Sequence, residues 1–444
     1  MPAAGGGGYT AAFWSHGTPR RMAASPVIAR RVGFALLVLA AVGLAAGKYA
    51  AKLDKPGRTD QQTRSAFLRW RPQVLALDAG TDIYVAFAYP NPPVMALILR
   101  PLYGLEPTAG ALVWFGMKAV LAGVTVWWAV RLARGPTPLP DWAAALVVLL
   151  TLHPVLGDLT HGNVNILIAF LLVAALDLLR RRWDFAAGLT LALAVACKVT
   201  PALFLPYLAW KGWWRALAGA TAGLALWLAV VPGAALGFER NGDLLRSWFD
   251  TLVKPFVVEG KITSEHANQS LPGLFTRLLT DAPSSFRYED DHPVPDEHHN
   301  LLALSPEAVR WLVRGCQVAF GVAGLLLLRT PRDRRQGLAV TAEYAYVALG
   351  MLMFSERTWK HHAVVLVLPY AVVVTALVRR PSRRLAGLLA AATVLSLGPS
   401  LVGGEFQDAA LVYGSHTAAF LLLTAGVLAV LWQERRYALG ERPV

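Results

Sequence analysis

The sequence predicts an all-α membrane protein, a polytopic bundle of about 12 transmembrane helices with two large outer loops. Hydrophobic residues make up 55% of the chain and charged residues only 16%, against about 25% charged residues in soluble globular proteins. Apolar runs close to the length of a bilayer crossing recur along the chain. The 42 Lys and Arg residues cluster in short segments between these runs. The basic charge therefore indicates positive-inside membrane topology, and nucleic-acid binding is not expected.

The N-terminal segment, residues 1–31, is rich in Gly, Ala and Ser and is expected to be a disordered cytoplasmic tail. An uncleaved first helix is predicted over residues 32–50, and it leaves the cytoplasm because Arg30 and Arg31 precede it. The alternative is a signal peptide, for which Ala45-Ala46-Gly47 offers only a poor cleavage site. The expected membrane domain covers residues 32–436, and residues 437–444 form a second cytoplasmic tail.

The other spans follow from the alternation of apolar runs and basic loops. A run that starts at a Lys/Arg segment leads out of the cytoplasm, and a run that ends at one leads back in. The two large outer segments are residues 51–107 and 239–304, and loops of that length are often functional lids. The expected spans are 111–132, 143–156, 164–179, 217–238, 308–328, 338–354, 363–378, 386–402 and 410–431.

Two apolar segments depart from this alternation. Residues 185–210 are too long for one span, and both of their ends resemble cytoplasmic ends. Lys198-Val199-Thr200-Pro201 lies in the middle, and proline disfavours helix at the preceding residue, so we expect two short helices that meet at an outer-facing break. Residues 94–105 are too short to span and are expected to lie on or dip into the outer leaflet. If they did span, every later direction would be reversed.

Basic side chains at two places predict a phosphate site. Lys198 lies within an apolar stretch, where a charge is costly and usually functional, and a broken helix exposes amides that suit an anion. The segment 355–362 lies between two spans and places positive charge outside, against the positive-inside bias. The alternatives are a lysine that snorkels to the interface and an interfacial turn anchored by Trp359. The basic or imidazole side chains of this segment are Arg357, Lys360, His361 and His362.

A carboxylate and a polar turn are the other candidates for chemistry. Asp60 follows the first helix closely, where it could act as a general base on a hydroxyl acceptor or simply cap a helix. Asp78 and Asp82 compete with it in the same loop. In the turn 161–165, hydrogen bonds to a sugar could come from His161, Asn163 and Asn165. The alternative for this turn is ordinary helix-capping chemistry.

No metal site and no cofactor are expected. Cys197 and Cys316 both lie in apolar runs and predict neither a disulfide nor a metal site. The pair His361-His362 lacks further ligands at the spacing that zinc sites use.

Several motifs follow one another in a fixed order over about residues 50–370, and together they resemble those of glycosyltransferase family 87. This family comprises polyprenol-phosphate-mannose-dependent α-mannosyltransferases with the GT-C membrane fold. Asn163 stands where the family usually has Gln, Asn91 splits a Tyr-Pro-Pro segment, and an extra residue lies between Ser355 and Trp359. The matching motifs are Asp60, Gly80–Tyr84, Tyr89–Pro93, Pro101-Leu102, Gly162–Asn165, Lys198–Pro201, Lys211–Arg215, Asn268–Leu271 and Ser355–His362.

The resemblance implies a GT-C-type transferase of a bacterial plasma membrane with its active site facing outside. It would transfer a hexose, with mannose as the expected sugar, from a polyprenyl-phosphate donor to a glycolipid or glycan acceptor by an inverting mechanism. Asp60 would be the base. The leaving phosphate would be stabilised by Lys198, Arg357, Lys360, His361 and His362. The sugar or the acceptor would contact Tyr84, Tyr89, His161, Asn163, Asn165, Asn268 and Trp359.

Other functions remain open at this point. A secondary transporter or flippase of a lipid-linked or small polar substrate would also use broken helices. The sequence shows no inverted repeat, however, and a transporter does not need two long outer loops with an acidic residue. A GT-C transferase that uses arabinose or glucose is a further alternative. A scaffold for envelope assembly would leave Asp60 without a role.

Overall fold

The computed structural model describes residues 26–53, 65–289 and 292–439. The chain forms two units, residues 1–41 and 42–444. The described part of the first unit is the beginning of helix α1 (Pro26–Leu53), and apart from the count of spans everything below concerns the second unit. The expected base Asp60 and most of the expected N-terminal tail lie outside the described residues.

Eight helices in the described ranges are long and apolar enough to cross a membrane, so the chain is a multi-pass membrane protein. One of these spans is continuous from α10 through the π-helical turn η2 to α11, and another joins η4 to α16. They are α1, α5 (Pro107–Arg134), α6 (Asp141–His161), α10–η2–α11 (Trp214–Leu224, Ala225–Val230, Val231–Leu236), α14 (Pro306–Leu327), η4–α16 (Lys360–Leu366, Val367–Arg379), α17 (Arg383–Val402) and α19 (Ser415–Ala438).

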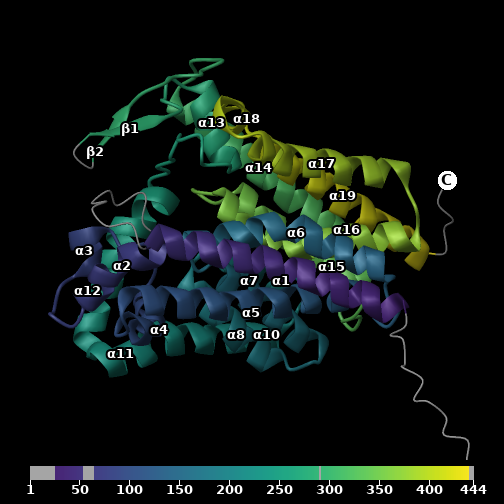
Figure 1. The fold of residues 1–444 in the computed structure, drawn as a ribbon, viewed down its shortest axis with the longest axis horizontal. Coiled ribbons are helices and arrows are strands. Elements are labelled where there is room, and N and C mark those ends of the chain that lie inside the picture. Colours follow the sequence, from purple (N-terminus) through teal and green to yellow (C-terminus); the bar gives the residue numbers. More distant parts are fainter. Residues whose placement is uncertain (1–25, 54–64, 290–291, 440–444) are drawn as a thin grey trace, which may run out of the picture. The chain divides into compact units, whose positions relative to one another are not determined.

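Shorter helices and one pair of strands complete the bundle and the segments at its ends (Figure 1). Strands β1 (Phe286–Glu289) and β2 (His292–Pro295) pair as an antiparallel hairpin. This hairpin departs from the all-α prediction and lies in the expected loop 239–304. The short helices are α2 (Ala66–Leu75), α3 (Ile83–Phe87), α4 (Pro93–Tyr103), α7 (Asn165–Arg180), α8 (Asp184–Cys197), η1 (Thr200–Leu203), α9 (Phe204–Trp210), α12 (Phe238–Trp248), η3 (Phe249–Val258), α13 (Leu271–Leu279), α15 (Leu338–Met353) and α18 (Gly404–Val412).

Helix α15 forms the centre of the bundle. Every residue from Leu338 to Met353 is buried, and the helix packs against α16, α19 and α5. A helix that is apolar on all sides has to be enclosed by other helices. Helix α14 instead turns large apolar side chains outward, and Trp311 is 68% exposed. Exposure of this kind is stable when the surrounding medium is lipid.

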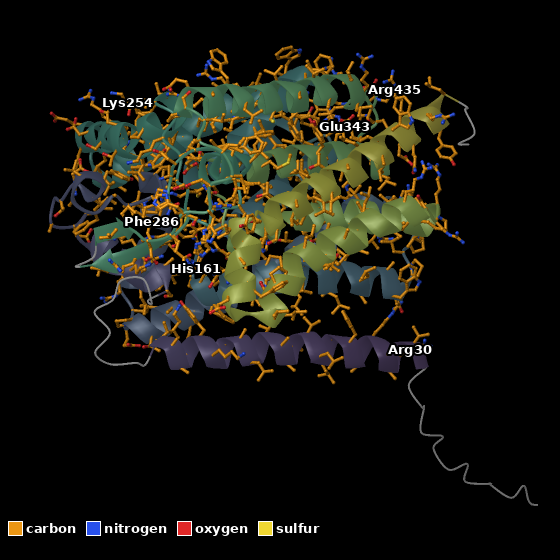
Figure 2. All side chains as sticks on the ribbon, turned by 90° about the horizontal axis from the view of Figure 1, so that it is seen from above. Arg30, His161, Lys254, Phe286, Glu343 and Arg435 are labelled. Atoms are coloured by element: carbon orange, nitrogen blue, oxygen red, sulfur yellow. The ribbon has the colours of Figure 1, made fainter. Side chains whose placement is uncertain are left out.

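The basic ends of several helices meet at one end of the bundle, here named the basic end. Arg379 donates to the carbonyl of Arg134 at 2.8 Å, which joins the ends of α16 and α5. Arg435 donates to the carbonyl of Leu326 at 3.1 Å, which joins α19 to α14. Figure 2 shows Arg435 far from His161 and Phe286, which lie at the opposite end, here named the site end. The expected directions of these spans are thereby confirmed relative to one another.

The predicted break near Lys198 is confirmed. Helix α8 ends at Cys197, and Lys198 has an extended backbone before η1 begins. At the start of α8, Asp184 pairs with Arg335 at the basic end. At the end of α9, Trp210 Nε1 donates to the carbonyl of Leu328 at 3.1 Å, also at the basic end. The segment therefore enters from the basic end, turns at the site end and returns.

Small residues let α8 and α10 pack closely, and the two helices run side by side in Figure 1. A Cβ atom on Gly188 would lie 2.0 Å from the carbonyl oxygen of Ala216, and one on Gly219 would lie 2.2 Å from that of Phe185. Gly219 and Gly223 have the small-xxx-small spacing that brings membrane helices into backbone contact.

Helix α4 is the element predicted not to span. It has 11 residues, so it is about 16 Å long and falls short of a hydrocarbon core of about 30 Å. Proline at its first position sets the start of the helix. Its buried residues pack beside α2 and α5, where they form part of the site end.

Candidate active site

A cavity of about 840 Å³ lies at the site end and is named the main cavity here. Segments that are far apart in the sequence form its walls. These are α2 and the loop after α3, the turn after α6, the break before η1, helix η3 with the residues after it, the first turns of α14, and the loop between α15 and η4.

Positive charge dominates the lining of the main cavity. Two carboxylates, Glu259 and Glu356, face five cationic side chains in the described part of the chain. Such an excess attracts and holds an anionic ligand such as a phosphate. The cations are Arg69, Lys198, Arg310, Arg314 and Arg357.

Lys198 is held by a chain of buried polar groups. Its ammonium Nζ donates to Asn165 Oδ1 at 2.6 Å. Asn165 Nδ2 donates in turn to Asp158 Oδ1 at 2.9 Å, and Asp158 Oδ2 lies 3.3 Å from Lys118 Nζ. Asp158 and Lys118 are completely buried, so each charge depends on the other for its stability. The chain of contacts links α5, α6 and α7 to the break and fixes the ammonium in the wall of the main cavity.

The charge on Lys198 is sensitive to pH. Burial lowers the pKa of this ammonium to about 8, and the nearby carboxylates of Glu356 and Asp158 oppose the shift. Lys198 lies in the break, outside the eight long spans. An ammonium with this pKa is mostly protonated at neutral pH, and it is poised to interact with an incoming anion.

Three imidazole rings and an indole ring form an aromatic wall. The rings of His161 and His361 stack with their centroids 4.0 Å apart, and Asn163 Nδ2 lies 3.3 Å from His361 Nε2. Trp359 stacks on His362 with centroids 6.4 Å apart. Ring faces beside hydrogen-bonding nitrogens suit an amphipathic ring such as a sugar. All of these residues line the main cavity except His361, which supports the wall from behind.

The loop that carries Arg357 is fixed by Asn268. The Asn268 side chain donates to the carbonyl of Glu356 at 2.8 Å and accepts from the amide of Thr358 at 2.9 Å. It is completely buried and does not line the main cavity. The structure therefore places Asn268 as a support of the loop, whereas the sequence had suggested a contact to sugar or acceptor.

Other expected site residues also lie away from the main cavity. Tyr84 and Tyr89 are completely buried, and the Tyr84 hydroxyl donates to the carbonyl of Asn91 at 3.0 Å. They pack behind Asn91, which does line the cavity. Lys360 lines a different cavity of about 180 Å³ and does not line the main cavity. Lys360 therefore does not share a cavity with Lys198, Arg357 and His362, with which the sequence had grouped it.

The competing carboxylates have structural partners. Asp78 forms an ion pair with Arg100 at 2.9 Å. Asp82 caps α3, where its Oδ1 accepts from the amide of Tyr84 at 2.9 Å. Neither lines the main cavity. In the described ranges, no three His, Cys, Asp or Glu side chains come together as a possible metal site.

Several lining residues were missed from the sequence. Glu356 lies within the segment that had been singled out, but only its cationic neighbours drew attention. Arg310, Arg314 and Gln317 have helical i, i+4, i+7 spacing at the start of an otherwise apolar span. This polar stripe is the signal that would have found them.

The fold and the cavity define a class: a multi-pass membrane protein with a cationic, aromatic cavity at one end of its helices. Comparison with known proteins then gives the family. The model of glycosyltransferase family 87 matches residues 87–356, more than half of the chain. The chain belongs to glycosyltransferase family 87 and is a glycosyltransferase. The matched range contains Lys198 and Asn268, but Asp60 precedes it and Arg357 to His362 follow it.

Two curated relatives are similar over most of their length. Each is a polyprenol-phosphate-mannose-dependent alpha-(1-2)-phosphatidylinositol mannoside mannosyltransferase. The protein from Mycobacterium tuberculosis is 28% identical over 359 residues, which cover 76% of this chain and 74% of the relative. The protein from Mycolicibacterium smegmatis is 28% identical over 409 residues, which cover 86% of this chain and 83% of the relative.

Proposed function

We propose that this chain is a mannosyltransferase that transfers mannose from a polyprenyl-phosphate donor to a glycolipid acceptor of the phosphatidylinositol mannoside class. The main cavity carries this proposal, because it combines cationic side chains with an aromatic wall in one space. The donor carries a phosphate and a sugar on one molecule. The phosphate matches the cationic side chains, and the sugar matches the aromatic wall. The names of the two relatives support the choice of donor and acceptor.

The proposed reaction is a single displacement. The acceptor hydroxyl oxygen forms a bond to the anomeric carbon of mannose as the bond from that carbon to the phosphate oxygen breaks. The electron pair leaves with the polyprenyl phosphate, and the carboxylate of Asp60 takes the hydroxyl proton. Attack from the face opposite the leaving group inverts the anomeric configuration.

Cations of the main cavity stabilise the leaving group in this mechanism. Lys198, Arg357 and the aromatic residue His362 all line this cavity and face the same space. Charge that develops on the phosphate oxygens is stabilised by fixed cations because they need no reorganisation during the reaction. Arg310 and Arg314 supply further positive charge from α14, which an acceptor with its own phosphodiester would use.

The proposed fold is GT-C-type with twelve crossings. Besides the eight long spans, α7, α8 and α15 would run between the two ends of the bundle, and η1–α9, although as short as α4, would return from the break to Trp210 at the basic end. The basic end would face the cytoplasm, as the positive-inside bias requires. The main cavity would then open to the outside of a bacterial plasma membrane, with α4 on the outer leaflet.

A transporter fits the geometry less well. Transporters hold their substrates near the middle of the membrane, where broken helices meet. The break at Lys198 lies beside Asn165, the first residue of α7, at the site end of the bundle. This position suits a ligand that approaches from one side only.

The test is a transfer assay with purified protein in lipid, radiolabelled polyprenyl-phosphate mannose and phosphatidylinositol mannoside. Asp60→Asn is compared with wild type and with Asp243→Asn, which changes an exposed carboxylate on α12. Transfer by wild type and Asp243→Asn but not by Asp60→Asn supports both the reaction and the base. Transfer by all three proteins would support the reaction but exclude Asp60 as the base, and Glu356 or Glu259 would become the candidate bases. Failure to transfer or bind any of a panel of lipid-phosphate sugars would favour the transporter.

A further inference from the structure

A second cavity of about 180 Å³ lies between α6, η4, α16, α17 and α19. It shares no lining residue with the main cavity. One part of its wall carries nitrogen-containing side chains and the rest is mainly aliphatic. The residues that matter below are Leu150, His153, Lys360, Leu366, Leu397 and His416.

The polar part of this second cavity brings together Lys360, His153 and His416. His416 is only 3% exposed, and neither of its ring nitrogens has a hydrogen-bond partner in the described part of the chain. A buried polar atom without a partner is costly, and most such atoms in folded proteins have one. The imidazole therefore faces a space that a polar ligand completes.

The apolar part of the second cavity leads toward the outer surface of the bundle. Leu150, Leu366 and Leu397 line it. Leu149 also lines it and is 53% exposed, while Val394 on the neighbouring α17 is 67% exposed. In a membrane these aliphatic side chains contact hydrocarbon. A ligand that fills the cavity is thus anionic at one end and aliphatic at the other.

We propose that the second cavity binds the phosphate group of a membrane lipid, with Lys360 and the two imidazoles as donors and the acyl chain along the leucines. An oxyanion with several acceptor oxygens matches donors that converge from three different elements. This site is separate from the main cavity, and it assigns a role to Lys360, which does not line the main cavity.

Occupancy of this site is connected to the loop that carries Arg357. The amide of His416 donates to Gln269 Oε1 at 3.2 Å, and the amide of Gln269 donates to the carbonyl of Thr358 at 2.6 Å. Lys360 itself is two residues beyond Thr358. A lipid phosphate held by Lys360 and His416 would therefore stabilise this loop from behind.

The experiment measures binding to purified protein in phosphatidylcholine nanodiscs. The probes are dihexanoyl phosphatidic acid, dihexanoyl phosphatidylcholine and inorganic phosphate, with native mass spectrometry to count bound molecules. The variants are Lys360→Gln, Lys360→Arg, Arg357→Gln in the main cavity, and Lys261→Gln as an exposed control. Lys360 is exposed, so its replacement should preserve folding, which a melting curve checks.

One phosphatidic acid molecule should bind wild type, Lys360→Arg, Lys261→Gln and Arg357→Gln. It should bind Lys360→Gln about tenfold or more weakly, because a charge-assisted hydrogen bond is lost. Equal binding to Lys360→Gln and wild type would overturn the proposal. Inorganic phosphate that binds as tightly as phosphatidic acid would overturn the lipid assignment. Because these readouts measure no transfer, a failed transferase assay leaves the result unaffected.

Discussion

Lys198 shows how much one residue depends on its surroundings. Lys198 is half-buried, and its ammonium is held in the wall of the main cavity by Asn165, which is itself held by Asp158. A buried lysine without such a partner would lose its proton. The contacts keep a cation at a place where a phosphate would need it.

Replacement of Lys198 by Met removes this cation and keeps a similar side-chain length. We expect kcat/KM for the polyprenyl-phosphate donor to fall by about 10- to 100-fold, the value of a charged hydrogen bond. Initial rates at several donor concentrations measure it, with Lys261→Met as the control. Equal kcat/KM for Lys198→Met and wild type would remove Lys198 from the donor site.

The pH dependence of the reaction follows from the same group. The pKa of Lys198 is lowered to about 8, so the ammonium is charged below that pH and loses its charge above it. Because kcat/KM reports groups of the free enzyme, it should fall as the pH rises through about 8. Lys198→Arg stays charged over this range, so its alkaline fall should move to higher pH. Identical profiles for the two proteins would contradict this assignment.

Helix α13 and the loops around it are organised by a buried arginine. Arg277 is completely buried, and its guanidinium donates to five backbone carbonyls from two separate segments. Burial lowers the pKa of Arg277 to about 10, so it stays protonated at neutral pH. The planar fork of arginine can reach several acceptors at once, which an ammonium cannot do. The carbonyls belong to Ser264, Glu265, Asn268, Leu411 and Val412.

Arg277→Lys should therefore lower the free energy of unfolding by at least about 2 kcal/mol, because buried carbonyls lose their donors. The melting temperature in detergent should fall, and the transfer rate should fall with it because Asn268 and its loop depend on this region. Arg246→Lys on exposed α12 is the matched control and should melt like wild type. A normal melting temperature for Arg277→Lys would argue against this role.

The close packing of α8 against α10 predicts that an added methyl group between them destabilises the protein. A single methyl group on Gly219 would meet the carbonyl oxygen of Phe185 at 2.2 Å, so Gly219→Ala must push the helices apart. We expect a loss of about 1 to 3 kcal/mol in stability and a lower yield of folded protein. Gly116→Ala on α5 has no atom within 4 Å of the new Cβ and should be neutral or slightly stabilising. Fluorescence-detected melting compares them, and equal behaviour would contradict the close packing.

At the scale of the whole molecule, the orientation in the membrane can be measured. Lys254 lies at the site end and is labelled in Figure 2, whereas Gln336 lies in the basic loop before α15. Each is replaced by cysteine in a separate variant, Lys254→Cys and Gln336→Cys. A membrane-impermeant maleimide should label Lys254→Cys on intact spheroplasts, and Gln336→Cys only after the membrane is opened. Wild type is the control for the native Cys197 and Cys316. The reverse labelling pattern would contradict an active site that faces outside.

Much of the helical framework could be predicted from the chain. The expected span 111–132 lies within α5, and the break at Lys198 occurs where the proline predicted it. These features depend on hydropathy, charge and proline placement along a continuous stretch of residues. The hairpin β1–β2 was not foreseen. Its strands have only four residues each, and β2 contains Pro293 and Pro295, which argue against a strand when only the sequence is read.

The candidate site was predicted only in part. Lys198, Arg357 and His362 were singled out and do line one cavity. Lys360 was grouped with them because it lies in the same short segment, but the chain turns between Arg357 and Lys360 and presents them to different cavities. Arg69 was overlooked because no neighbour in the sequence reveals its role, and Arg310 because only its helical spacing to Arg314 and Gln317 marks it.

The sequence by itself determined that this is a membrane protein, which residues form most of its helices, and which family its motifs resemble. Those properties follow from local composition and from the order of short motifs. Only the tertiary structure decided which polar side chains share a cavity, that Asn268 supports a loop, and that Lys360 and His416 meet in a second cavity. A cavity is formed by contacts between distant segments, and such contacts depend on how whole helices pack.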